Sequence, residues 1–325
     1  MIVDCGVPQG SVLGPFLFIM YTADLVALVD RYGLNPHMYA DDIQIVGSCH
    51  PTASATSILR HRIENCGADS ADWMASNRLQ QNTSKTEVMW CSTSRRRHLI
   101  ASNHFTIGSD IIEPVETVRD LGLYLDTTMS MKRHITQLTS TCFGILRQIR
   151  SIRRCLTSRA RTMLVTCFVF ARLDYCNAVF AGLPRCDLDR LQSIQNAAVR
   201  LIAGARKFDH VTPLLQARHW LPVEQRVVFK LCVMMYKTVN CMAPSYLHDY
   251  VILPASGAYS RRLRSADTGQ LCVPRTRTAI GDRAFAVAGP RAWNSLPVQV
   301  RSAPSLPTFK KHLKTHLFRC AYDTV

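Results

Sequence analysis

The sequence Met38-Tyr-Ala-Asp-Asp-Ile43 places two adjacent carboxylates, Asp41 and Asp42, between apolar residues that favour β-strands. We expect a β-hairpin over His37–Val46 with both acids at its bend. Adjacent like charges repel one another, and a divalent metal ion bound by their oxygens removes that repulsion. An Asp-Asp pair is also common in ordinary turns, because aspartate tolerates the backbone angles of turns. Taken alone, the pair favours the plain turn, and the surrounding sequence has to change that balance.

A segment rich in glycine and proline precedes the pair. Gly6–Pro15 reads Gly-Val-Pro-Gln-Gly-Ser-Val-Leu-Gly-Pro, and an apolar stretch, Phe16–Val29, follows it. The glycines permit backbone conformations and close approaches that a side chain would block. This suits a loop that lies against a nucleotide or a template strand, with Gln9 and Ser11 as hydrogen-bonding groups. The same composition also suits a loop that only starts a buried helix over residues 12–29.

Two further segments follow the pair: Asn82–Glu87 reads Asn-Thr-Ser-Lys-Thr-Glu, and Val118–Leu125 reads Val-Arg-Asp-Leu-Gly-Leu-Tyr-Leu. In this order, the four segments resemble motifs B, C, D and E of the reverse transcriptase of a non-LTR retrotransposon (LINE-type, close to the jockey-like elements). Each segment is unspecific by itself, whereas their joint occurrence is specific. Gly289–Pro297, which reads Gly-Pro-Arg-Ala-Trp-Asn-Ser-Leu-Pro, also resembles the carboxy-terminal region of such elements, so the resemblance covers essentially the whole chain.

The resemblance implies an α+β fold with three parts. Residues 1–126 are expected to form a partial polymerase palm, built of antiparallel hairpins and helices and carrying motifs B to E. Residues 127–205 match a helical, basic thumb by position. Residues 206–325 are expected to form a mostly helical carboxy-terminal region with a loop rich in arginine, proline and glycine. A length of 325 residues with 47% hydrophobic content suits a folded chain of two or three domains.

Hydrophobic periodicity predicts the individual elements. Helices are expected over residues 52–79, from about 130 onward, and over 158–170, 187–202, 223–239 and 305–320. A strand is expected over 88–91, a hairpin over 105–112, and a strand pair or bend over 118–125. Residues 254–304 are rich in arginine, glycine, proline and serine, and we expect loops to dominate there.

The resemblance also assigns roles to residues within the motifs. Asp41 and Asp42 would be the catalytic metal ligands, with Asp42 the less important of the two. Lys85 would donate a proton to the leaving pyrophosphate or neutralise its charge, although a plain surface lysine fits its position equally well. The nucleotide and template pocket would include Gly6, Pro8, Gln9, Gly10, Ser11 and Tyr39, and the primer grip would include Leu121 and Gly122. Two alternatives stay open: Tyr39 could pack on the helix behind the hairpin, and Gly122 could serve only a tight bend.

The family needs a third carboxylate, carried by motif A well upstream of motif B. Asp4 is the only acid before Gly6 and lies too close to it in sequence to stand in. We therefore expect a carboxy-terminal part of a polymerase that is not competent by itself, because positioning and charge neutralisation supply most of the rate of phosphoryl transfer. The complete enzyme would use Mg²⁺ or Mn²⁺, an RNA template, a DNA primer and deoxynucleoside triphosphates. A non-catalytic nucleic-acid-binding remnant and a translated relic without a role remain as alternatives.

The chain is strongly basic, with a net charge of +16, which indicates a polyanionic partner. The stretch Thr127–Leu173 contains no aspartate or glutamate. Within it, Arg147, Arg150 and Arg154 follow a spacing of i, i+3 and i+7, which predicts one basic helix face. Such a face suits a nucleic-acid phosphate backbone, and the absence of acids favours this interpretation over an ordinary solvated face.

The 13 cysteines are scattered without paired Cys-x-x-Cys spacing, and no signal peptide is visible. We expect reduced thiols in an intracellular protein of the nucleus or cytoplasm. Phe16–Val29 is shorter than the ~20 apolar residues that a membrane span needs, so no membrane partner is expected. His312, His316 and Cys320 could share a helix face, but three potential zinc ligands without a fourth favour a structural helix.

Overall fold

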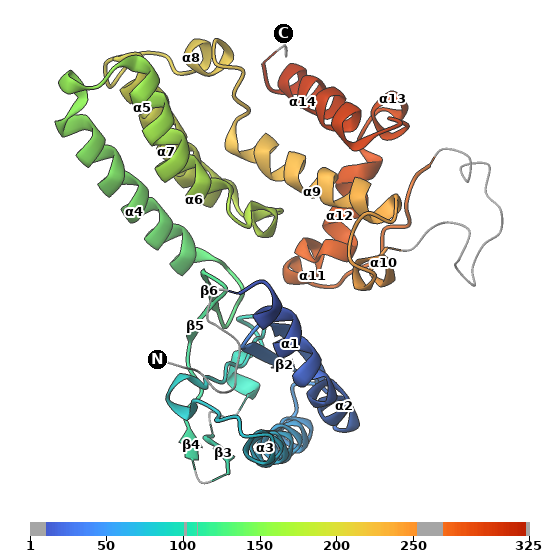
Figure 1. The fold of residues 1–325 in the computed structure, drawn as a ribbon. Coiled ribbons are helices and arrows are strands. Elements are labelled where there is room, and N and C mark those ends of the chain that lie inside the picture. Colours follow the sequence, from blue (N-terminus) through green and yellow to red (C-terminus); the bar gives the residue numbers. More distant parts are fainter. Residues whose placement is uncertain (1–10, 101–102, 109, 252–268, 323–325) are drawn as a thin grey trace. The chain divides into compact units, whose positions relative to one another are not determined.

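The computed structural model describes residues 11–100, 103–108, 110–251 and 269–322. It consists of helices and small antiparallel hairpins, which confirms the α+β expectation at this level (Figure 1). The chain divides into two compact units. The amino-terminal unit comprises the residues up to Leu121 together with Asp126–Thr128, and the carboxy-terminal unit comprises Gly122–Leu125 and the residues from Met129 onward.

In the amino-terminal unit, two apolar helices lead into a hairpin, a long helix and further short strands. The elements are α1 (Leu13–Tyr21), α2 (Ala23–Arg31), β1 (Asn35–Tyr39), β2 (Asp42–Val46), α3 (Ala53–Ser76), η1 (Thr83–Lys85), η2 (Arg97–Leu99), β3 (Phe105–Ile107), β4 (Asp110–Ile112) and β5 (Thr117–Asp120). The strand β5 pairs with β6 (Leu123–Asp126). The hairpins expected around residues 37–46 and 105–112 are thus confirmed, as is the long helix that follows the first of them.

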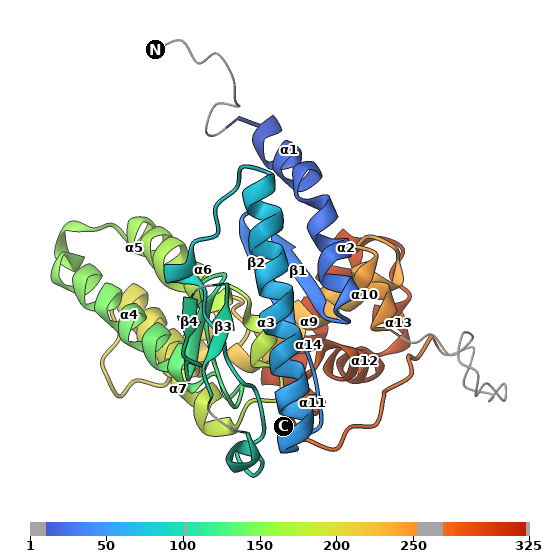
Figure 2. The same ribbon diagram turned by 90° about the horizontal axis from the view of Figure 1, so that it is seen from below.

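The core of this unit lies between the first hairpin and the helices α2 and α3. Successive side chains of a strand point to opposite faces, and the apolar side chains Met38, Ile43 and Ile45 pack on a cluster that includes Leu25 and Leu59. Figure 2 shows α3 running across the β1–β2 hairpin, in agreement with this packing. The opposite face of the hairpin is therefore left for polar residues.

The apolar stretch after the glycine-rich segment does not form one buried helix. It breaks at Thr22, whose hydroxyl donates to the carbonyl of Phe18 at 2.9 Å, and α1 contains no buried residue. Large side chains are exposed along α1, among them Phe16 at 65% and Met20 at 74%. The expectation of a buried helix is wrong for α1 and right for α2, which buries Leu25, Leu28 and Val29.

One described segment, Leu13–Arg31, is long and apolar enough to cross a membrane, with a mean hydropathy of 1.6. This corrects the argument that the apolar stretch is too short, because α1 and α2 together extend beyond Val29. Length and composition alone do not assign a membrane span, since a core helix of a soluble protein and a signal sequence meet the same criterion.

The carboxy-terminal unit is built almost entirely of helices. They are α4 (Lys132–Ser151), η3 (Arg153–Cys155), α5 (Ser158–Val165), the π-helical turn η4 (Thr166–Phe170), α6 (Ala171–Asp174), η5 (Asn177–Phe180), α7 (Arg185–Ala203), α8 (Thr212–Gln216), α9 (Val223–Val239), α10 (Tyr246–Asp249), α11 (Ala279–Arg283), α12 (Phe285–Asn294), α13 (Val298–Arg301) and α14 (Leu306–Tyr322). The helices expected over 158–170, 187–202, 223–239 and 305–320 are confirmed within a few residues, and α9 agrees at both ends.

Two apolar clusters hold this unit together. One lies between α4, α5 and α7, where Ile135, Leu138 and Leu146 of α4 recur with the helical period and are buried. The other joins α9, α12 and α14 around the rings of Tyr236, Trp293 and Phe309, and Figure 1 shows these helices side by side. The prediction of helices from about residue 130 onward is thus confirmed. The helices form because apolar residues recur along one face of each helix and are buried there.

Two local expectations are wrong. Residues 88–91 do not form a strand, and only an isolated bridge between Val88 and Pro114 occurs there. Loops do not dominate the part of residues 254–304 that the structure describes, because α11, α12 and α13 lie within it. The reason is packing: Val287, Trp293 and Val300 are buried in spite of the glycines and prolines around them. Tertiary burial here overrides local propensity.

The segment Gly289–Pro297 stabilises the core between α9, α12 and α14 through side-chain hydrogen bonds. Trp293 donates its indole N–H to the carbonyl of Gly269 at 3.0 Å. Asn294 accepts from the backbone N–H of Leu271 and donates to its carbonyl, both at 2.8 Å. Leu271 is buried, so its backbone groups depend on this one amide side chain.

Replacing Asn294 with alanine is expected to lower the free energy of unfolding by about 2 kcal/mol, because a buried N–H and a buried carbonyl both lose their partner. Urea denaturation followed by near-ultraviolet circular dichroism measures the change. The matched control is Ser295→Ala, which removes only an exposed hydroxyl that donates within its own helix and should change the free energy by less than about 0.5 kcal/mol. Equal effects of the two substitutions would contradict the assignment.

Candidate functional site

The hairpin β1–β2 places the two adjacent acids at its tip. Tyr39 pairs with Asp42, so Ala40 and Asp41 are the two residues of the turn and Asp42 begins β2. Ala40 has a φ of 52°, a left-handed conformation that residues other than glycine adopt rarely. Both carboxylates are exposed. The expected bend is therefore confirmed, with one acid in the turn and the other at the start of the strand.

One face of the hairpin is polar and continues away from the tip. Asp42 and Gln44 lie two residues apart on β2 and share this face, opposite the face that packs on the core. Tyr39, directly across from Asp42, is 67% exposed. The alternative in which Tyr39 packs on the helix behind the hairpin is therefore excluded. Its expected place near the primer end stays a prediction.

A third carboxylate, Asp120, lies near this polar face. The amide of Gln44 donates a hydrogen bond to the carboxylate of Asp120, the last residue of β5. Burial raises the pKa of Asp120, and the charge of Asp42 raises it further, while the hydrogen bond from Gln44 lowers it. We did not select Asp120 from the sequence. A signal was present, because it directly precedes the Leu121-Gly122 pair that we did select.

Leu121 and Gly122 form the turn between β5 and β6. Their φ angles are 42° and 84°, and a type I′ turn requires positive φ at both central residues. A side chain at Gly122 would also approach the ring of Tyr175 to 3.4 Å. The conformation explains the glycine, so the tight-bend interpretation is supported, and the role of this turn as a primer grip stays a prediction.

The other predicted site residues are distributed as follows. Ser11 accepts a hydrogen bond from the backbone N–H of Gly14 at 3.1 Å, in the segment that enters α1. Lys85 ends η1 and is exposed. Gly6, Pro8, Gln9 and Gly10 lie outside the described residues. The loop that would line the nucleotide pocket is therefore represented by Ser11 alone.

The metal ligands can be judged by their chemistry. The oxygens of Asp41 and Asp42 are the hard ligands that Mg²⁺ prefers. Within the described ranges, no group of three or more histidine, cysteine, aspartate or glutamate side chains could hold a metal ion. The acidic pair fits part of a magnesium site. The same observation applies to α14, where His316 and Cys320 lie one turn apart, their ring nitrogen and sulfur atoms 3.7 Å from each other, without forming a zinc site.

The predicted basic face is only partly helical. Arg147 and Arg150 lie in the last turns of α4, but α4 ends at Ser151 and Arg154 belongs to the short helix η3. The spacing of i, i+3 and i+7 therefore does not describe one continuous helix, and that expectation is wrong for Arg154. All three side chains are exposed.

Comparison with known proteins agrees with the motifs. A family model described as reverse transcriptase (RNA-dependent DNA polymerase) matches residues 2–125. The chain is 26% identical over 234 residues to the "Probable RNA-directed DNA polymerase from transposon BS" of Drosophila melanogaster, which covers 70% of this chain and 25% of that protein. It is 26% identical over 211 residues to the "RNA-directed DNA polymerase from mobile element jockey" of Drosophila funebris, which covers 62% and 22%. No solved structure matches the chain.

The region of residues 2–125 that matches this family model contains the acidic hairpin, Lys85 and the Leu121-Gly122 turn. The chain is similar to two RNA-directed DNA polymerases of Drosophila mobile elements, at 26% identity in each case. It spans about a quarter of the length of these two relatives, 25% and 22% respectively.

The environment of Asp120 predicts how stability changes with pH. The pKa of Asp120 is raised in the folded state, so the folded protein binds this proton more tightly than the unfolded chain. The ionised group therefore costs stability that is absent below its unfolded pKa of about 3.9 and fully present above its folded pKa. Asp120→Asn keeps an acceptor for Gln44, and its stability relative to the unmodified protein should rise from pH 3 to pH 7.

Urea denaturation at several pH values in that range measures this difference. Gln44→Ala supplies the control, because it removes the hydrogen bond that lowers the pKa of Asp120. In the Gln44→Ala background, the gain from Asp120→Asn should be larger at pH 7. A gain that is the same at pH 3 and pH 7 would show that the carboxylate carries no such penalty.

Proposed function

We propose that the chain belongs to an RNA-directed DNA polymerase of a non-LTR retrotransposon. That enzyme would extend a DNA primer along an RNA template with deoxynucleoside triphosphates and Mg²⁺ or Mn²⁺. The observation that supports this most directly is the tip of the β1–β2 hairpin, where Asp41 and Asp42 are exposed although the opposite face of the hairpin packs into the core. This tip lies inside the region that matches the reverse transcriptase family.

The proposed roles follow the chemistry of each side chain. Asp41 and Asp42 would hold the divalent metal, which supplies charge stabilisation for phosphoryl transfer when bound. Lys85 would neutralise or protonate the leaving pyrophosphate. Tyr39 would lie beside the primer end, which its 67% exposure permits. The loop residues Gly6, Pro8, Gln9, Gly10 and Ser11 would contact nucleotide and template, and Leu121 and Gly122 the primer strand.

The division into parts remains part of the proposal. A palm over residues 1–126 is supported by the small antiparallel hairpins of that region. A thumb over 127–205 is supported by the helices α4 to α7 and by the exposed arginines at the end of α4. The helices α9 to α14 would belong to a separate carboxy-terminal region over 206–325.

We further propose that the polypeptide of residues 1–325 does not polymerise DNA at a useful rate by itself. Two carboxylates at one exposed hairpin tip hold a metal weakly, and among the described residues no third side chain completes a metal-binding group with them. Metal positioning is what phosphoryl transfer depends on. The basic stretch Thr127–Leu173, which contains no acid, would still bind nucleic acid. The alternative function is therefore that of a non-catalytic nucleic-acid-binding module.

Primer extension tests the activity. The purified polypeptide, with an RNA template, a DNA primer and Mg²⁺ or Mn²⁺, should give no more extension than its Asp41→Ala variant. Extension that Asp41→Ala abolishes would overturn the proposed inactivity of this polypeptide and would establish Asp41 as catalytic. The template and primer must be shown to bind in the same buffer, so that absence of extension reports on chemistry.

Metal binding tests the role of the acidic pair independently of turnover. Mn²⁺ bound at the hairpin tip should broaden the nuclear magnetic resonance signals around Asp41 and Asp42 at low metal concentration. Asp41→Asn should raise the Mn²⁺ concentration needed for this broadening about tenfold, which corresponds to about 1.4 kcal/mol, because it removes a charged oxygen ligand of a hard cation. Asp110→Asn, in the β4 strand of the same unit, is the matched control. Equal effects of the two substitutions would exclude a metal role for the pair.

A further inference from the structure

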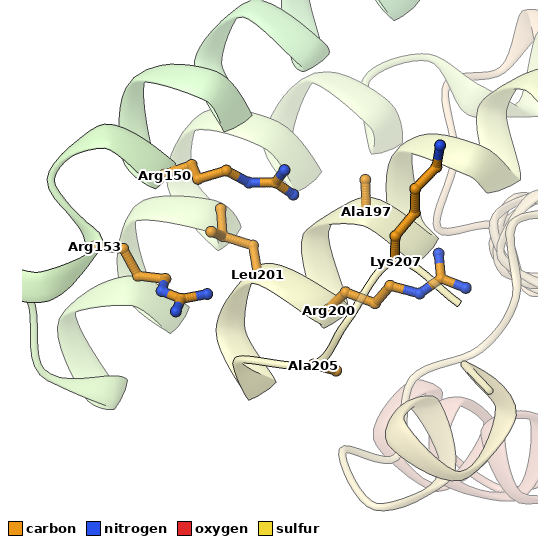
Figure 3. Close-up of a pocket in the computed structure, with 7 residues that line it drawn as sticks. All are labelled: Arg150, Arg153, Ala197, Arg200, Leu201, Ala205 and Lys207. Atoms are coloured by element: carbon orange, nitrogen blue, oxygen red, sulfur yellow. The ribbon is translucent and has the colours of Figure 1, made fainter. Parts of the chain in front are cut away.

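A hollow of about 270 Å³ lies in the carboxy-terminal unit, where α4 and α7 end (Figure 3). Four cationic side chains line it: Arg150, Arg153, Arg200 and Lys207. Its remaining lining is apolar and consists of Ala197, Leu201 and Ala205. We call this hollow the arginine pocket. Only Arg150 among its cations was expected from the sequence to contact nucleic acid.

The fold brings these cations together from segments about 50 residues apart. Arg150 lies in the last turn of α4, and Arg153 begins η3 directly after it. Arg200 lies in the last turn of α7, one turn after Ala197, and Leu201 follows it directly. Gly204 then adopts a φ of 72° and ends α7, which turns the chain so that Lys207 also reaches the pocket.

No carboxylate among the described residues neutralises the four charges through an ion pair. Eight ion pairs occur among the described residues, one of which involves a histidine. None of them involves Arg150, Arg153, Arg200 or Lys207. The adjacent acid, Asp209, accepts the backbone N–H of Arg206 at 2.6 Å, and only its main-chain carbonyl accepts from Arg200. Arginine stays protonated at all relevant pH values, so the pocket keeps its charge.

Helix dipoles account for only part of this arrangement. Cations are favourable near the carboxy-terminal end of a helix, and Arg150 and Arg200 occupy the last turns of α4 and α7. Arg153 and Lys207 lie outside both α-helices, yet they line the same hollow. Four like charges around one cavity repel each other, and a bound anion would relieve that repulsion.

We propose that the arginine pocket binds a phosphate group of a nucleic-acid backbone. Its volume of about 270 Å³ is slightly below the ~300–1,000 Å³ of typical small-molecule sites, and it suits a phosphate with part of its sugar. The apolar floor is compatible with a sugar face, and arginine forks match phosphate oxygens. The exposed Arg147 and Arg154 flank the pocket in sequence and extend the positive surface beyond it, as a continuous strand requires and a free anion does not. The proposal rests on the proposed function for the identity of the polyanion.

The test compares two double variants of the 325-residue chain. Arg153→Gln with Lys207→Gln removes two pocket charges whose side chains make no hydrogen bond in the described structure. Lys310→Gln with Arg319→Gln removes the same charge from exposed positions in α14, outside the acid-free basic stretch. Fluorescence anisotropy with a labelled RNA–DNA hybrid at several salt concentrations gives the affinity and its salt dependence. Circular dichroism verifies that each variant is folded.

We expect the pocket variant to bind about 10-fold more weakly at low salt. The plot of log affinity against log salt concentration should become less steep by ~1–2 units of slope. Each phosphate contact that is lost reduces the steepness by about one unit. The control should bind less than about 3-fold more weakly. Equal reductions in both variants would show a general charge effect and overturn the pocket. Unchanged affinity in the pocket variant, with firm binding by the unmodified chain, would overturn the pocket and leave the proposed function standing.

Inorganic phosphate separates the two possible sources of the anion. If the unmodified chain binds no hybrid, the proposed function and the pocket assignment both fail. In that case, inorganic phosphate at about 10 mM could still raise the melting temperature of the unmodified chain but not that of the pocket variant. This result would show that the pocket binds free phosphate instead of a nucleic acid. Hybrid binding that depends on Arg153 and Lys207, with at most a weak effect of inorganic phosphate, supports the proposal.

Discussion

The arrangement of the candidate site depends on the alternation of side chains along the β1–β2 hairpin. Met38, Ile43 and Ile45 are the residues through which this hairpin packs on α2 and α3. A shift of the register by one residue would turn every one of these side chains to solvent, so the core fixes the register. With the register fixed, Asp42 and Gln44 must lie on the polar face and Asp41 must lie in the turn. The exposure of the acids is thus a consequence of burial on the other face.

The same reasoning explains what the sequence reveals well and what it does not. The hairpin, α3 and α9 follow from local alternation or helical periodicity, and the structure reproduces them. The burial of α1 depends on which surfaces exist to cover it, and no local pattern reports that. The helix α12 contains Pro290 and follows a segment rich in loop-forming residues, but Trp293 anchors it in the core. Propensity predicted a loop there because it contains no information about this packing.

The candidate site shows the same limit at the level of single residues. Asp41 and Asp42 are visible in the sequence because they are adjacent and flanked by apolar residues. Asp120 is not, because it meets Gln44 across 76 residues of chain and only the fold brings the two together. The arginine pocket is a second example, since the run of arginines identified the basic stretch around Arg150 but not the contribution of Arg200 and Lys207 from α7 and the segment after it. Sequence patterns therefore reveal sites within one element more readily than sites shared between elements.

The bond between Gln44 and Asp120 also gives a physical reason for two motifs to occur together. The acidic pair lies at the tip of one hairpin, and Asp120 directly precedes the turn of another. A hydrogen bond from the polar face of β2 to the end of β5 joins these two strands. The charge of Asp42 acts on Asp120 in the opposite sense, since it disfavours the ionised form that this bond stabilises. A cation bound near Asp42 would reduce that repulsion, so metal binding at the tip and the attachment of β5 would support each other.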